Sequence, residues 1–324
     1  MHLNFFISGS KPATRYVVVF FTGIVLLLFI TGASVLDAIL KSELSHGHVQ
    51  LLKYQKSKLR QNLQIDVALL GDSSLGNSID AHAWSKKQAN NTISLALTGA
   101  YGFGGTYIFA KEAISRGAKY LVIVNTIDIF NRPIEQDYKA VVFASSSLRD
   151  ILNSDIGFKT VFETILSIDL ATSAFHVGLA RLFHYQAPNK YPVQLIKKVD
   201  YIPQGKPIDT NQFDGRINLK KTALEKTNFL KKIAELCRQY KVTCYYAHGP
   251  IHKSYCINSI DYIKKLNNLI ASANIELLSP LPYCLNDDEV GDSADHVHPD
   301  LKQKVSGWYL SQFRSKVKVT SVHR

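Results

Sequence analysis

Acidic residues are scarce in this 324-residue chain: 26 Asp and Glu face 38 Lys and Arg, a formal net charge of +12. A basic balance of this kind is typical of proteins that meet nucleic acid, an anionic membrane surface or an anionic polymer. The basic residues form no long run, however, and the sequence has neither zinc-finger spacing nor the aromatic and basic signature of RNA-binding modules. These absences argue against nucleic acid as a partner.

Charged residues are also absent from residues 16–36. At about 1.5 Å rise per residue, a helix of that length spans a hydrocarbon core of roughly 30 Å. Lys11 and Arg15 precede the run, so we expect residues 1–15 in the cytoplasm and the bulk of the chain on the other side of the membrane, periplasmic or extracellular. A cleavable signal peptide, with Thr31 and Ala33 at the cleavage site, is the alternative, although the run is long for one.

Cysteine is rare, and all four residues (Cys237, Cys244, Cys256 and Cys284) fall in the last third of the chain. An even number in an exported domain indicates disulfides. Three pairings are possible, and we expect Cys237–Cys244 with Cys256–Cys284. The alternative is four buried free thiols. The spacing does not fit a zinc site.

Beyond the apolar run, residues 37–64 are lysine-rich and predict a helical stalk, and residues 65–324 predict one α/β domain. Short apolar runs alternate there with stretches of helical spacing, which indicates a parallel sheet covered on both faces. Residues 130–220 interrupt this alternation and predict an insertion. The expected strands are 65–70, 92–97, 119–125, 242–247 and 275–278, and the expected helices include 219–240, 258–273 and 301–313.

Polar and glycine-rich segments follow these strands. In open parallel sheets, sites form at the carboxyl ends of the strands, so we expect the segments to meet. Taken alone, the first of them is an ordinary strand-to-helix turn, and the sequence has neither G-x-S-x-G nor G-x-G-x-x-G. The segments are Gly71–Ser74, Gly99–Gly105, Asn125–Asp128, His248 and Asp295–His298.

Among these segments, Ser73, His298 and Asp295 are candidates for a catalytic triad. A serine hydroxyl becomes a useful nucleophile when an imidazole takes its proton and a carboxylate orients that imidazole. The three residues supply one of each group. His296 and His298 form an H-x-H pair with Asp292 and Asp295 nearby. Such a set could also bind zinc or manganese, which we consider the weaker interpretation.

The same residues resemble the motifs of the SGNH (GDSL-like) hydrolase and acyltransferase superfamily. Gly71-Asp72-Ser73 is similar to its first block, the stretch around Gly99 to its second, and Asp295 to Pro299 to its last, Asp-x-x-His-Pro. The resemblance implies a three-layer α/β/α, flavodoxin-like fold and no cofactor. It also implies an oxyanion hole formed by the N–H groups of Ser73 and Gly99.

One block departs from the SGNH pattern. The family's third block is Gly-x-Asn-Asp, and here Asn125-Thr126-Ile127-Asp128 places Ile127 where the oxyanion-binding asparagine is expected. Asn125 lies two residues away, on the same face of an extended strand, and is the candidate substitute. From their places at the strand ends we expect further substrate-binding residues: Asp72, Ser74, Tyr101, Asp128 and His248.

An N-terminal anchor before an SGNH-like domain is similar to the teichoic acid D-alanylation protein and to alginate O-acetylation proteins, which work beside membrane-bound O-acyltransferases. This resemblance implies a serine esterase or O-acyltransferase acting on O-acyl groups of a cell-envelope glycan. It also implies an acyl donor and a membrane-bound O-acyltransferase as partners. Two alternatives stay open: an inactive SGNH-like domain that binds glycan or scaffolds a membrane partner, and a flavodoxin-like ligand-binding domain without covalent chemistry.

Overall fold

The computed structural model of the chain describes residues 16–23, 47–61, 64–144, 204–213, 215–220 and 222–322. Within these residues the chain folds around a parallel five-stranded sheet with the strand order β2-β1-β3-β4-β6. A short parallel pair, β5 and β7, stands apart from it. The strands are β1 (Val67–Gly71), β2 (Thr92–Ala96), β3 (Tyr120–Asn125), β4 (Thr243–His248), β5 (Ile251–His252), β6 (Glu276–Leu277) and β7 (Cys284–Leu285).

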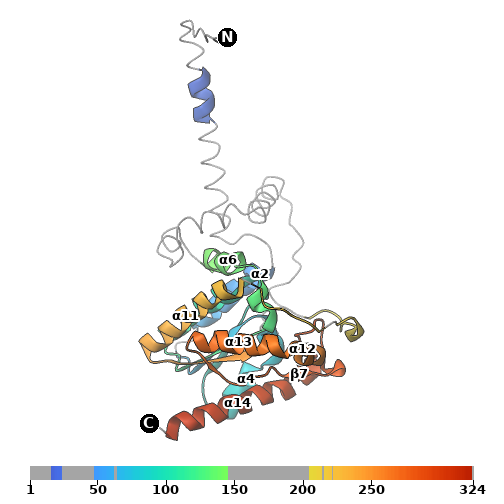
Figure 1. Cartoon of the computed structure of the whole chain (residues 1–324). Coiled ribbons are helices and arrows are strands. Elements are labelled where there is room, and N and C mark those ends of the chain that lie inside the picture. The colour runs from blue at the N-terminus through green and yellow to red at the C-terminus, as the bar shows by residue number, and fades with distance from the viewer. Residues whose placement is uncertain are drawn as a thin grey trace.

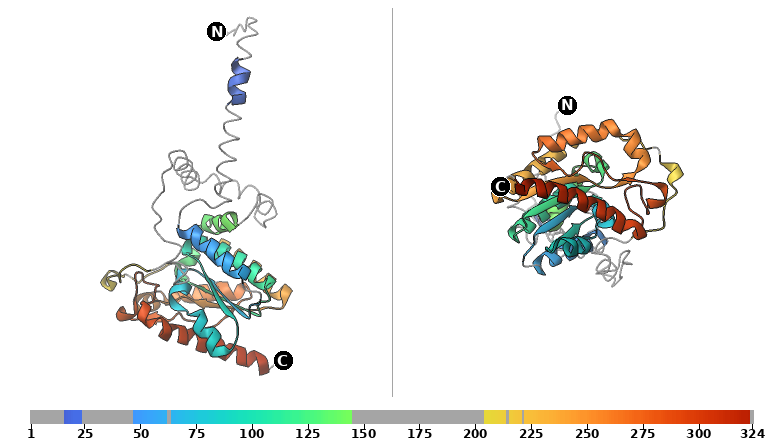
Figure 2. Two further views of the ribbon diagram at one scale, coloured as in Figure 1. Left: turned by 180° about the vertical axis from the view of Figure 1, so that it is seen from behind. Right: turned by 90° about the horizontal axis from the view of Figure 1, so that it is seen from below.

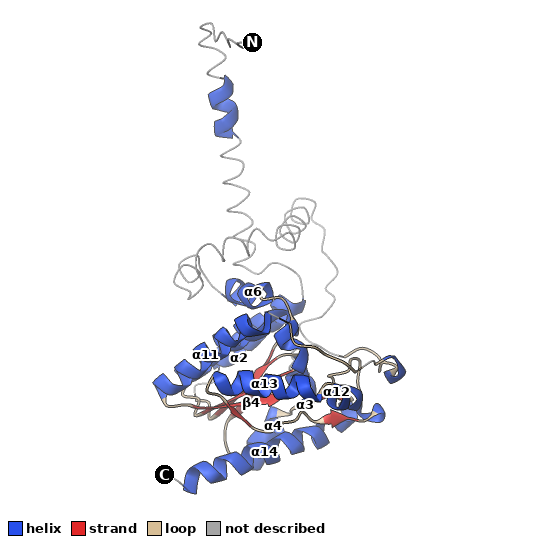
Figure 3. Cartoon of the chain, in the orientation of Figure 1, coloured by secondary structure: helices blue, strands red, loops and turns tan. Residues whose placement is uncertain are grey.

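Helices cover both faces of this sheet and give an α/β fold in three layers (Figures 1 and 3). The α-helices are α2 (Gly47–Gln61), α3 (Ser73–Ser78), α4 (Ala81–Gln88), α5 (Gly102–Ser115), α6 (Glu135–Ala144), α11 (Thr222–Tyr240), α12 (Lys253–Asn258), α13 (Ile260–Ser272) and α14 (Lys302–Val322). The 3-10 turns are η1 (Gly99–Tyr101), η2 (Ile127–Asn131), η3 (Thr210–Gln212), η4 (Asp287–Glu289) and η5 (Pro299–Leu301).

Two apolar clusters explain why the helices divide between the faces. Successive side chains of a strand point to opposite faces, so Leu121 and Ile123 of β3 pack on one side and Val122 and Val124 on the other. The first cluster includes residues of α2, α5, α11 and α13, and the second includes residues of α3, α4 and α14. The view from below in Figure 2 shows α14 lying across its face of the sheet. Burial on both faces accounts for the continuous apolar runs of the strands.

The segment before the sheet is helical, as predicted for a stalk, and it also packs onto the domain. Leu51, Leu52 and Leu59 of α2 are 0–1% exposed. The Gln55 side-chain amide donates to the Ala96 carbonyl oxygen at 2.9 Å, which ties α2 to the end of β2. Of the predicted membrane span 16–36, only residues 16–23 are described, and they are helical. None of the described helices is both long and apolar enough to cross a membrane.

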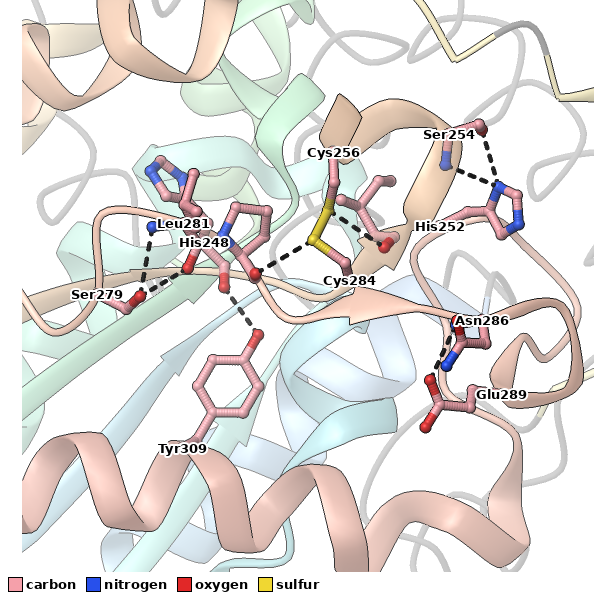
Figure 4. Close-up of a disulfide and its surroundings, with 12 residues drawn as sticks. His248, His252, Ser254, Cys256, Ser279, Leu281, Cys284, Asn286, Glu289 and Tyr309 are labelled. Atoms are coloured by element: carbon pink, nitrogen blue, oxygen red, sulfur yellow. Dashed lines mark hydrogen bonds between the residues drawn. A yellow bond between two sulfur atoms is a disulfide. The ribbon is translucent and has the colours of Figure 1, made fainter. Parts of the chain in front are cut away.

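Both expected disulfides are present. Cys237–Cys244 joins the end of α11 to β4, and Cys256–Cys284 joins α12 to β7, with Cα–Cα distances of 6.3 and 6.0 Å. Figure 4 shows the second disulfide beside the end of β4. These separations lie in the usual range for a disulfide. The second bridge fixes the small β5–β7 pair, from which the chain continues into the Asp292–Pro299 segment.

Candidate functional site

The strand order reverses between β1 and β3, and this point is where ligands bind in open parallel sheets. Asp72, at the end of β1, is 3% exposed. Its carboxylate accepts hydrogen bonds from the Ser74 N–H at 2.9 Å, the Ser74 hydroxyl at 2.5 Å and the Thr126 N–H at 3.1 Å. Asp72 therefore joins the carboxyl ends of β1 and β3 and fixes the turn that carries Ser73.

Burial and the nearby charges set the proton affinity of Asp72. Burial raises its pKa to about 6, Asp295 adds to the rise, and Arg132 with the Ser74 and Thr126 hydrogen bonds opposes it. Of the predicted substrate-binding residues, Asp72 and Ser74 are thus engaged with each other. Tyr101 is 3% exposed, and burial raises the pKa of its phenol.

Ser73 is the first residue of α3 and is half-buried. Its carbonyl oxygen accepts a hydrogen bond from the Asn77 side-chain amide at 2.9 Å, which fixes the helix turn. The Ser73 hydroxyl, in contrast, makes no hydrogen bond to another described residue. The predicted nucleophile is therefore held by its backbone, while its hydroxyl has no partner in the described part of the chain.

The imidazole that has a carboxylate at its Nδ1 belongs to His296. Its Nδ1 lies 2.6 Å from Oδ1 of Asp292, and the ring is 17% exposed. Burial disfavours protonation of the ring, but the hydrogen bond to Asp292 and the negative charges of Asp295, Asp292 and Asp72 outweigh it and raise the His296 pKa. A carboxylate at Nδ1 requires the proton on that nitrogen, which leaves Nε2 as the basic atom.

Asp292 is itself held by two donors. Its Oδ2 accepts from the Gly205 N–H at 2.6 Å, while Oδ1 accepts from His296. Burial opposes ionisation of Asp292, but the hydrogen bonds from His296 and Gly205 outweigh it and lower its pKa. The Gln204 side-chain amide donates to Oδ1 of Asn77 at 2.6 Å and to the Val297 carbonyl oxygen at 2.7 Å. Residues 204 and 205 therefore connect α3 with the Asp292–Val297 loop.

The predicted pair Asp295 and His298 is not brought together. His298 caps η5: its Nδ1 accepts from the Asp300 N–H at 3.4 Å and lies 3.7 Å from the Asp300 carboxylate. Asp295 instead accepts a hydrogen bond from the Ser293 hydroxyl at 2.5 Å. The Asp-x-x-His spacing pointed to His298, whereas the contacts give His296 the orienting carboxylate.

Arg132 is a second site residue that the sequence did not reveal. A Cβ built on Gly99 would overlap the Arg132 guanidinium, so the guanidinium lies directly on the α-carbon of the predicted oxyanion-hole glycine. Arg132 donates to both oxygens of Asp128, at 3.0 and 3.2 Å. Burial opposes its charge, but Asp128, Asp72 and Asp295 outweigh that and raise its pKa.

Asn125 and His248 are neighbours in the register of β3 and β4 and are 0% and 1% exposed. Neither polar atom of the Asn125 side chain has a hydrogen-bond partner among the described residues. Nε2 of His248 lies 2.7 Å from Oδ1 of Asn267, and the His248 carbonyl oxygen accepts from the Tyr309 hydroxyl at 2.8 Å, drawn in Figure 4. Burial lowers the His248 pKa to about 4, which the Asn267 hydrogen bond partly opposes, so the ring is neutral near pH 7.

The residue at the family's asparagine position, Ile127, is fully buried and offers no side-chain donor. Its carbonyl oxygen accepts a hydrogen bond from the Tyr262 hydroxyl at 2.6 Å. His252 pairs with Asp287 at 2.9 Å and caps α12, away from the strand-end cluster. Among the described residues, no group of three or more His, Cys, Asp or Glu side chains is arranged to hold a metal ion.

No family model matches the chain, and no curated protein is significantly similar to it.

Proposed function

We propose that the chain is an SGNH-like serine esterase or O-acyltransferase with Ser73 as its nucleophile. One observation carries this proposal. The Asp292 carboxylate orients the His296 imidazole, and the negative charge of Asp72 contributes to the raised pKa of that ring. Asp72 is the residue before Ser73, whose hydroxyl has no hydrogen-bond partner among the described residues. The position of Asp72 and Ser73 at the end of β1, where the strand order reverses, supports the proposal further.

The chemistry follows the order usual for such groups. Nε2 of His296 takes the Ser73 proton as the serine oxygen bonds to the acyl carbon of an ester. The tetrahedral intermediate collapses, the ester's alcohol leaves with the proton from His296, and an acyl-serine remains. Water or a sugar hydroxyl then gives its proton to His296 and takes the acyl group, which restores Ser73.

The negatively charged oxygen of the tetrahedral intermediate must be stabilised by hydrogen-bond donors. We assign the N–H groups of Ser73 and Gly99 and, in place of the missing asparagine, the Arg132 guanidinium that lies on Gly99. Preorganised donors of this kind are usually the largest contribution to such catalysis, and one donor is worth roughly 10²–10³ in rate. Asn125 remains the other candidate, because its buried amide has no partner among the described residues.

The proposed location is a membrane surface outside the cytoplasm, with a cell-envelope glycan or an acyl donor as substrate and a membrane-bound O-acyltransferase as partner. Six consecutive bulky apolar side chains, Tyr16 to Phe21, are 53–77% exposed, which supports contact with lipid. An inactive domain that binds glycan is the second candidate, because Ile127 supplies no donor and the Arg132 guanidinium fills the space above Gly99.

A fluorophosphonate probe, which labels activated serines covalently, tests the nucleophile. The full chain in detergent is compared with Ser73→Ala, His296→Ala and His298→Ala, with the exposed Ser272→Ala and His82→Ala as matched controls. We expect labelling to disappear in the Ser73 and His296 variants and to persist in the others. Labelling that instead depends on His298 would assign the base to His298. A folded wild-type chain that is not labelled would reject the enzyme and favour the inactive domain.

A further inference from the structure

A short irregular segment, residues 204–208, lies against the loop that includes Gly291 and Asp292. The Gly205 N–H donates to Oδ2 of Asp292 at 2.6 Å, and the Ile208 N–H donates to the Gly291 carbonyl oxygen at 3.0 Å. Two backbone donors therefore bind this segment, which we call the strap, to the loop.

Gln204, the first residue of the strap, connects two other parts of the chain through its side-chain amide. The amide nitrogen lies 2.6 Å from Oδ1 of Asn77 in α3 and 2.7 Å from the carbonyl oxygen of Val297. An amide NH2 group carries two donors, so this one side chain serves both acceptors. Asn77 and Val297 are 0–1% exposed, so their acceptors depend on Gln204 rather than on solvent.

The Asn77 side chain extends this contact to Ser73. Its nitrogen donates to the Ser73 carbonyl oxygen at 2.9 Å, while its oxygen accepts from Gln204. At the other end, Val297 is the residue directly after His296. A line of hydrogen bonds therefore runs from the backbone of Ser73 through Asn77 and Gln204 to the backbone beside His296.

The oxygen of the Gln204 amide is placed by close packing. A Cβ built on Gly291 would lie 2.0 Å from this oxygen, Oε1, so the oxygen rests directly against the Gly291 α-carbon. The Gly291 N–H in turn donates to the His296 carbonyl oxygen at 2.7 Å. The amide of Gln204 is therefore held against the loop through its nitrogen and its oxygen.

We propose that Gln204 is a positioning residue, whose amide fixes how Ser73 and the His296 ring are placed relative to each other. The assignment rests on the proposed function in taking these two residues as nucleophile and base. Gln204 acts through α3 and the loop, and it takes no part in proton or acyl transfer. Its two neighbours are both acceptors, which explains why a side chain with two N–H donors stands here.

The rate of fluorophosphonate labelling tests the assignment on the full chain in detergent. Gln204→Ala is compared with Gln239→Ala, which truncates an exposed glutamine of α11. We expect Gln204→Ala to slow labelling by roughly 10–10²-fold, since a misplacement of about 1 Å can cost the larger factor. The control variant should be labelled at the wild-type rate. A wild-type rate in Gln204→Ala would overturn the proposal.

Gly291→Ala disturbs the same contact without changing Gln204, because the added methyl group takes the place of Oε1. We expect this variant to slow labelling as well. If both substitutions act through one contact, Gln204→Ala/Gly291→Ala should slow labelling by less than the product of the two single effects. A combined effect equal to that product would mean two unrelated losses of structure, and would count against the proposal.

The pKa of His296, measured by NMR on chain with labelled histidine rings, gives a readout that needs no reaction. Burial lowers this pKa, and the hydrogen bond to Asp292 with the charges of Asp295 and Asp72 raises it above the ordinary value. Without Gln204 the loop holds Asp292 less firmly against the ring, so the pKa should fall toward the ordinary value, and it should not change in the control variant. This fall in a chain that is not labelled would keep the positioning role and reject the esterase. An unchanged pKa would overturn the positioning role, whether or not the chain is labelled.

Discussion

The proton on Nδ1 of His296 is fixed by a single carboxylate, so Asp292 decides whether this ring can act as a base. The wild-type pKa of His296 is raised, and a base works only when neutral. Activity should therefore be lost as pH falls through a midpoint above the usual histidine value. The direction of this shift therefore tests His296 as the base.

Replacing Asp292 by Asn should lower that midpoint, because the charge that favours the imidazolium is removed. It should also slow serine labelling by roughly 10²–10⁴-fold, since the orienting hydrogen bond is lost. The pH dependence of fluorophosphonate labelling measures both effects. Asp300→Asn, beside His298, is the matched control, and a shift in that variant instead would name His298 as the base.

Substitution of Arg132 tests a second residue, the proposed donor to the oxyanion. If its guanidinium holds the oxyanion, Arg132→Ala should slow labelling by roughly 10²–10³-fold. Thermal stability should change little, because the partner Asp128 is 44% exposed and can be solvated. Arg238→Ala, an exposed arginine on α11, serves as control. Unchanged or faster labelling in Arg132→Ala would mean that the guanidinium blocks the site.

Some of these site residues can be predicted from the sequence and others cannot, for physical reasons. Asp72 and Ser73 were found because a buried apolar run ending in small polar residues predicts a strand end. The Asp292–His296 pair was not, because a four-residue spacing has no meaning in a loop until its conformation is known. Arg132 was missed because its contact with Gly99 joins two loops that are adjacent only in the folded sheet.

At the scale of elements, the strands and the helices α11 and α13 were predicted to within a few residues, since burial on two faces leaves continuous apolar runs in the strands. The last helix was predicted to end at residue 313, whereas α14 continues to Val322. The helix α12 was not predicted, because six residues are too few to show helical periodicity. The small β5–β7 pair escaped prediction as well. Its two strands have two residues each, and the disulfide beside them supplies order that local sequence does not.

The two disulfides should differ in what they contribute. Cys256–Cys284 closes a loop of 28 residues and Cys237–Cys244 one of 7. The chain-entropy model then gives about 3.6 and about 2.4 kcal/mol of unfolding free energy. Urea unfolding of the Cys256→Ala/Cys284→Ala and Cys237→Ala/Cys244→Ala variants checks the order. A larger loss from the short loop would contradict the entropic account at these positions.

At the scale of the whole molecule, two buried groups, His248 and Asp72, change the free energy of unfolding in opposite directions as pH falls. His248 has a folded pKa of about 4, below its ordinary 6.5, so its contribution is present above pH 6.5 and is lost as pH falls toward 4. Asp72 has a folded pKa of about 6, above its ordinary 3.8. The folded state therefore gains stability from Asp72 as pH falls from 6 toward 4, and the two effects partly cancel.

Single substitutions should expose each effect. Relative to wild type, His248→Gln should gain about 3 kcal/mol of unfolding free energy as pH falls from 6.5 to 4, because the neutral amide avoids the cost of a buried charge. Asp72→Asn should lose a similar amount over the same range. Chemical unfolding at several pH values measures both differences. Differences that do not vary with pH would show that neither group titrates in this window.

The proposed nucleophile and its proposed base stand 223 positions apart, at residues 73 and 296. Ser73 follows the strand β1, whereas the His296 loop follows β7, so the strands β2, β3, β4 and β6 all lie between them in the chain. During synthesis, the serine therefore emerges long before the imidazole that is proposed to activate it. If the proposed function holds, a partly made chain carries only an ordinary serine hydroxyl, and its reactivity requires the fold that joins the two ends of the domain.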